Sequence, residues 1–177
     1  ERYRSALTLR PDLTEAHYNL GGVLRMQGEP DAAIESYRRA LVLKPDYAEA
    51  HNDMGAALKN LGHLDEALEH YRKAVALMPG FADAHNNLGS ALRAQGDLDG
   101  AIASYREALA LKPDYAWAVN GQGIVLERLG RYDEALDMYR RASNIAPDDV
   151  WHWYNQGNLL VLQERYPEAI DLLEHAI

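Results

Sequence analysis

The chain has 177 residues, of which 27 are acidic and 18 are basic, so its formal net charge is −9. This charge repels phosphate backbones and anionic lipid, which makes nucleic acids and membrane surfaces poor candidate partners. The absence of cysteine excludes disulfides, thiol nucleophiles and thiolate metal sites, and no run of 18 apolar residues is present that could span a bilayer.

A 34-residue repeat organises the chain. The repeats begin at Thr14, Ala48, Ala82, Ala116 and Val150, and we number positions within each repeat from these residues. They cover residues 14–47, 48–81, 82–115, 116–149 and 150–177, the fifth being cut near its end, and residues 1–13 are the tail of a preceding repeat. Position 8 is always glycine and position 27 is always alanine: Gly21, Gly55, Gly89, Gly123 and Gly157, and Ala6, Ala40, Ala74, Ala108, Ala142 and Ala176.

In chain order, each repeat predicts a helix, a tight turn and a second helix. In the third repeat the first apolar or small stripe has helical spacing: His85, Leu88, Gly89 and Leu92. Gly96 then ends the first helix, and Pro113 ends the second. A single helical hairpin cannot bury its apolar face, whereas stacked neighbours can, so the repeats predict one continuous all-α solenoid of antiparallel hairpins.

These recurring residues resemble the tetratricopeptide repeat family over essentially the whole chain. The resemblance implies a right-handed superhelix whose concave wall is lined by the first helix of each repeat. The wording of residues 84–109 resembles the repeat arms of O-linked N-acetylglucosamine transferases, and equally those of bacterial scaffold proteins. The chaperone-binding members of the family use a carboxylate clamp with bases at positions 2, 5 and 6, and these bases are missing here.

The first helix of each repeat carries a second stripe, at positions 2, 5, 6, 9, 12 and 13, roughly 150° around the helix from the packing stripe. We expect this stripe to meet a ligand. Position 6 reads Asn19, Asp53, Asn87, Gly121 and Asn155. An asparagine amide can pair with any peptide backbone, and in the transferase-like arms an asparagine ladder at this position grips extended substrates. The alternative is a polar position that only faces solvent.

Charged and aromatic residues continue the same stripe. Position 12 carries Arg25, Lys59 and Arg93. These cations either attract acidic residues of a partner or complement the dipole at the C-terminal end of the helix. We favour the second interpretation, because exposed charges at such a position contribute little energy. Position 2 changes from acidic residues to Trp117 and Trp151, and Tyr18 and Tyr154 lie at position 5. Such aromatics either anchor an interface or pack beneath the preceding linker.

No catalytic chemistry is visible in the sequence. His17, His51 and His85 share position 4, but equivalent atoms in stacked repeats lie about 10 Å apart, too far to ligate one metal ion. We therefore interpret them as packing residues and find no ligand spacing for His70 or His152. No cofactor is expected.

The sequence therefore predicts a non-enzymatic scaffold that binds a peptide or a partner surface in its concave groove. Two alternatives stay open: the substrate-recognition arm of a larger enzyme of the glycosyltransferase type, and a scaffold that self-associates through its truncated end repeats. The cytoplasm is the favoured compartment, although a chain that opens in mid-repeat at Glu1 could be preceded by a targeting segment. We also expect the fourth and fifth repeats to be looser, because Gln122 and Gln156 replace apolar residues and Glu164 replaces the turn glycine.

Overall fold

The computed structural model describes residues 7–175, and within that range it contains helices and turns but no strand. Residues 7–9 are helical, and five helical hairpins follow. The first helices of the hairpins, hereafter the A helices, are α2 (Thr14–Met26), α4 (Ala48–Asn60), α6 (Ala82–Gln95), α8 (Ala116–Arg128) and α10 (Val150–Leu162). The second, or B, helices are α3 (Pro30–Leu43), α5 (Leu64–Leu77), α7 (Leu98–Leu111), α9 (Tyr132–Ile145) and α11 (Tyr166–His175). Ala6 and Ala176 lie outside the described residues.

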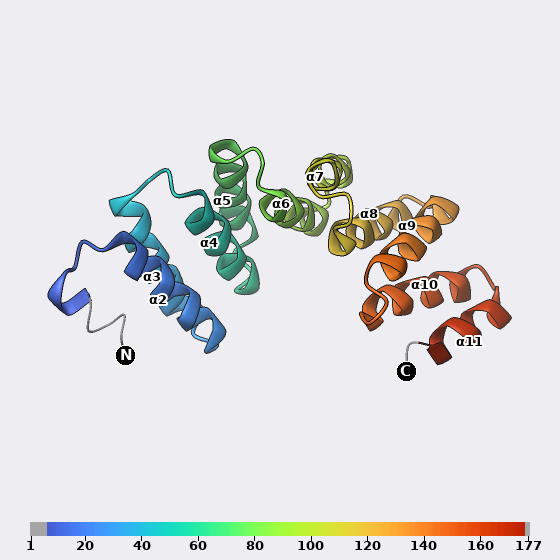
Figure 1. Ribbon diagram of the computed structural model, residues 1–177. Helices are drawn as coiled ribbons and strands as arrows, with labels where there is room; N and C mark the ends of the chain where they lie inside the picture. The colour runs from blue at the N-terminus through green and yellow to red at the C-terminus, as the bar shows by residue number, and fades with distance from the viewer. Residues whose placement is uncertain (1–6, 176–177) are drawn as a thin grey trace.

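The hairpins stack into an elongated arc, with the hairpin of α2 and α3 at one end and that of α10 and α11 at the other (Figure 1). Each A helix contacts its own B helix, and each of the first four also contacts the A helix of the next hairpin. Across the described part of the chain, by contrast, no B helix contacts another B helix. The A helices therefore lie closer together and form the inner side of the arc, while the B helices splay apart on the outer side. The predicted all-helical solenoid is confirmed. None of the helices in residues 7–175 is long and apolar enough to cross a membrane.

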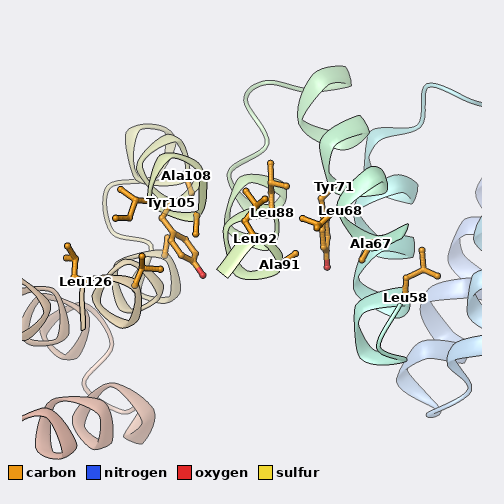
Figure 2. Close-up of a cluster of buried hydrophobic side chains, with 14 of the residues drawn as sticks. Leu58, Ala67, Leu68, Tyr71, Leu88, Ala91, Leu92, Tyr105, Ala108 and Leu126 are labelled. Atoms are coloured by element: carbon orange, nitrogen blue, oxygen red, sulfur yellow. The ribbon is translucent and has the colours of Figure 1, made fainter. Parts of the chain in front are cut away.

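The core is a continuous row of side chains between the hairpins rather than one central cluster. Figure 2 shows it running from Leu58 through Tyr71 and Leu88 to Tyr105 and Leu126. Its largest members share position 24 and are almost completely buried: Tyr37, Tyr71, Tyr105 and Tyr139. The position-8 glycines give these rings their space: a Cβ built on Gly21 would lie 2.6 Å from Tyr37 Cε1, and one on Gly123 2.7 Å from Tyr139 Cε1.

The turns between A and B helices repeat one geometry. A residue one or two positions after the helix adopts a positive φ, and the next N–H donates to a carbonyl five residues back, as from Asp97 to Leu92 at 3.0 Å. This is the Schellman arrangement, which glycine accommodates without strain. Four of the turns use glycine there: Gly28, Gly62, Gly96 and Gly130. The fifth places Glu164 at φ 61°, the only non-glycine residue with positive φ in residues 7–175.

Candidate ligand-binding face

Position 4 of the A helices ties each linker to its repeat. His17, His51 and His85 each donate a ring Nε2–H to a proline carbonyl six residues earlier, at 2.9 to 3.0 Å. Trp153 donates its Nε1–H to Pro147 O in the same way, at 2.9 Å. The fourth repeat has Val119 at this position, and there Arg141 donates to Pro113 O instead. Because a carbonyl can only accept, the contact also fixes the histidine tautomer. These histidines are hydrogen-bond donors as well as packing residues.

Positions 5 and 6 form a ladder of hydrogen bonds that crosses from repeat to repeat. Asn87 Nδ2 donates to Asn52 Oδ1 at 2.9 Å, and Asn155 Nδ2 donates to Asn120 Oδ1 at 3.0 Å. The partners are 35 residues apart in each case, position 5 of one repeat pairing with position 6 of the next. We call these pairs the rungs.

The first rung uses different side chains in the same places. Tyr18 OH donates to Asp53 Oδ2 at 2.9 Å, and Asn52 Nδ2 also donates to Asp53, at 3.2 Å. Burial and the Asp53 carboxylate raise the pKa of the Tyr18 hydroxyl, so it is a stable donor at neutral pH. Asn19 is exposed, and within residues 7–175 no rung precedes it.

One rung is missing between the third and fourth repeats. Asn86 occupies position 5, but Gly121 at position 6 has no side chain to pair with it, and no other described residue pairs with Asn86. Tyr105 takes the space, because a Cβ on Gly121 would lie 2.5 Å from Tyr105 Cζ. The gap opens into a pocket of about 290 Å³ that also reaches Trp117. We call this the gap pocket.

The position-12 residues differ in their surroundings. Arg25 is exposed, whereas Lys59 and Arg93 are half-buried and both line the gap pocket. Lys59 Nζ donates to Ser90 Oγ at 2.9 Å. In the fourth repeat Glu127 accepts a 2.6 Å bond from Tyr139 OH, and in the fifth Val161 is exposed. The sequence grouped the three cations as one surface, but the structure brings only two of them together.

The two position-2 tryptophans are exposed, so the packed alternative is not observed. Trp117 is 52 % exposed and Trp151 is 59 % exposed. Trp117 lies edge-on to the buried His152 ring at 5.4 Å, and Trp151 meets Tyr154 in a similar arrangement at 5.8 Å. Tyr18, by contrast, packs against the rings of Tyr37 and Tyr47. The fourth and fifth repeats thus have an aromatic inner surface that the first three do not.

A second polar cluster, missed by the sequence analysis, lies between α3, α4 and α5. His51 Nδ1 and His70 Nδ1 are 2.9 Å apart, at the edge of a cavity of about 530 Å³ that Arg38 and Lys73 also line. Since His51 donates through Nε2 to Pro45 O, its Nδ1 accepts and His70 Nδ1–H donates. Burial first, and then the neighbouring His51, lower the pKa of His70 to about 4. In residues 7–175 no three metal-ligating side chains converge.

A curved stack of paired helices with a polar ladder along its inner helices is the architecture of a helical repeat protein. Family models described as tetratricopeptide repeat match residues 80–148, 114–177 and 48–81, and one described as TPR repeat matches residues 21–62. The chain belongs to the tetratricopeptide repeat family. No curated protein matches it.

Solved structures with this fold align over nearly the whole chain. MamA is 28 % identical with a TM-score of 0.77, over 88 % of this chain and 91 % of that protein. A thermophilic TPR protein from Thermus thermophilus, TTC0263, is 25 % identical with a TM-score of 0.78, over 92 % and 89 %. YrrB, described as a TPR protein with an unusual peptide-binding site, is 23 % identical with a TM-score of 0.76, over 100 % and 91 %. These matches agree with the family assignment over nearly the whole length of the chain.

Proposed function

We propose that the chain is a protein-interaction module that binds an extended segment of a partner along the inner face of the arc. The observation that carries the proposal is the ladder. Asn87 and Asn155 each commit one N–H to a rung, which leaves a second N–H and a carbonyl oxygen with no partner in residues 7–175. Because the rungs hold these amides in one orientation, a peptide backbone meets donors and acceptors that need no further ordering.

The family supports the same function. YrrB is described as having a peptide-binding site, although at 23 % identity its likeness to this chain establishes the fold alone. An arc of stacked repeats offers an extended concave surface, which is the feature that solenoid proteins use for binding. Attachment to a larger enzyme stays a prediction of the sequence resemblance.

The test uses displayed random twelve-residue peptides panned against residues 1–177, followed by anisotropy measurements on fluorescein-labelled binders. In the Asn87→Ala/Asn155→Ala variant, we expect affinity to fall about 10- to 30-fold, since two hydrogen bonds contribute about 1 kcal/mol each. Asn144→Ala is the matched control, because Asn144 is an exposed asparagine on the outer helix α9. Equal affinities in all three proteins, or no enriched peptides, would refute the proposal.

A further inference from the structure

The gap pocket differs in charge from the molecule that contains it. The chain carries a formal charge of −9, yet the charged residues that line the pocket are two cations, Lys59 and Arg93. Neither cation forms an ion pair with a carboxylate in residues 7–175. Two positive groups of an otherwise acidic molecule therefore lie together here, without a paired carboxylate in the described part of the chain.

The two cations are also held in place and partly removed from water. Lys59 is anchored by its bond to Ser90 Oγ, and the Arg93 side chain hydrogen-bonds Tyr105. Arg93 Nε itself is buried without a hydrogen-bond partner in residues 7–175. Burial first, and then the charge of Arg93, lower the pKa of Lys59. A buried donor without an acceptor is costly to leave unpaired. An anion that enters the pocket would supply the missing acceptor and the missing charge together.

The other residues that line the pocket indicate which chemical group would fit beside the two cations. Asn86, left unpaired by Gly121, adds an amide, while Trp117 and Ile124 add apolar surface. Position 2 is acidic in the first three repeats but Trp117 here, so the pocket has an aromatic wall where a carboxylate would otherwise stand. A carboxylate on a short aliphatic stem fits these walls: oxygens toward the cations and methylenes against the indole. The pocket lies in the middle of the stack, with inner face on either side, which suits a side chain rather than the end of a peptide.

We infer that the gap pocket is a specificity pocket for an aspartate or glutamate side chain of the bound segment, read by Lys59 and Arg93 beside Trp117. The inference rests on the proposed function, because it assumes that an extended segment lies along the ladder. It makes the missing rung the place where this module recognises a side chain, while the intact rungs hold the backbone.

The experiment compares the peptides selected by three proteins from the same displayed random library. These are the unmodified chain, Lys59→Gln/Arg93→Gln, and the control Arg72→Gln/Arg106→Gln. The control removes the same charge from the same two repeats, at exposed residues of the outer helices α5 and α7. Helical CD and urea unfolding establish that each variant is folded.

We expect the unmodified chain and the control to enrich peptides with one fixed acidic residue, and the pocket variant to lose that preference. Replacing the acidic residue of a selected peptide by its amide should lower affinity for the unmodified chain about 10- to 100-fold and leave affinity for the pocket variant nearly unchanged.

Two failures are distinguishable. If peptides are enriched and their binding depends on Asn87 and Asn155, but no acidic position emerges or the amide peptide binds equally well, the specificity pocket is refuted and the binding face stands. If no peptides are enriched, the proposed function itself is refuted. A selected position that prefers phosphoserine over glutamate when both peptides are synthesised would assign the pocket to a phosphate and overturn the carboxylate assignment.

Discussion

Adjacent glycines in α2 offer a direct measurement of how tightly the hairpin is packed. A Cβ at Gly21 would lie 2.6 and 2.7 Å from two ring carbons of Tyr37, a side chain with 0 % exposure. A Cβ at Gly22 would have only Tyr37 OH within reach, at 4.0 Å. Both residues are inside the same helix, so the two substitutions to alanine share a backbone effect and differ in packing.

The magnitudes follow from two opposing terms. Alanine in place of glycine inside a helix stabilises by about 1 kcal/mol. Gly22→Ala should therefore raise the free energy of unfolding by up to about 1 kcal/mol. Gly21→Ala gains the same term but must displace a buried ring, and overpacking costs about 1–3 kcal/mol. Since the Tyr37 ring is fully buried, we expect the upper part of that range and a net loss of about 1–2 kcal/mol.

The assay is urea unfolding followed by helical CD, with amide exchange in α3 as a local reading, because a repeat array can unfold from one end. Exchange in α3 should become faster in Gly21→Ala and unchanged or slower in Gly22→Ala. If Gly21→Ala were as stable as Gly22→Ala, the close packing of position 8 against position 24 would not be what requires glycine.

Three further outcomes are expected. Glu164→Gly should raise the free energy of unfolding by about 1 kcal/mol, because the left-handed conformation costs a non-glycine residue roughly 1–2 kcal/mol; no gain in urea unfolding would contradict this. His85→Ala should lower the free energy of unfolding by about 1 kcal/mol, because the Pro79 carbonyl loses its hydrogen bond. Unchanged hydrogen exchange of the linker amides would show that this bond does not hold the linker in place. Because the pKa of His70 is lowered to about 4, the unfolded chain binds a proton there at higher pH than the folded chain does. The free energy of unfolding should therefore be highest above about pH 6.5 and should decrease by about 2–3 kcal/mol as the pH falls to 4. His70→Asn should make this decrease smaller; the same pH dependence in both proteins would contradict the role of His70.

The 34-residue repeat was sufficient to predict the fold, because its recurring residues make their contacts within a single hairpin. Gly96 ends a helix whatever its neighbours are, and Gly89 and Tyr105 belong to one hairpin whose pairing follows from helical spacing. Glu164 was recognised as a departure for the same reason, and the structure places it at the positive φ that glycine would otherwise take. Whether the C-terminal repeats are looser stays a prediction, although the buried and unpartnered Gln156 Oε1 is consistent with it.

The candidate site was less predictable, because its contacts depend on the offset between neighbouring repeats. Position 6 was singled out, but its partner at position 5 of the preceding repeat, as in Asn52 with Asn87, depends on how two hairpins are stacked. A search for polar pairs 35 residues apart would have found the rungs. The contact between His51 and His70 joins an A helix to its own B helix. The spacing of the two histidines in the sequence is not one that metal ligands use, so it did not indicate the contact. Gly121 interrupts the polar residues at position 6 in the sequence, and only the structure shows that it forms one wall of a pocket.

The inner face also constrains the spacing of residues in a bound segment. The gap pocket lies beside Trp117, and the next repeat presents Trp151 and Tyr154, both about half exposed. Neighbouring repeats are separated by about one helix diameter, ~10 Å, which an extended peptide spans in about three residues. An acidic residue in the pocket should therefore be accompanied, about three residues away, by an aromatic or large aliphatic residue that contacts Trp151.

This spacing can be measured on the selected peptides. Trp151→Ala should lower the affinity of such peptides about 10- to 100-fold, in line with an aromatic anchor, while the preference for the acidic residue remains. Peptides in which the apolar residue is moved by two positions should lose most of the benefit. If affinity did not depend on this spacing, the peptide would not be extended along the stack, and a contact with only one repeat would explain the binding better.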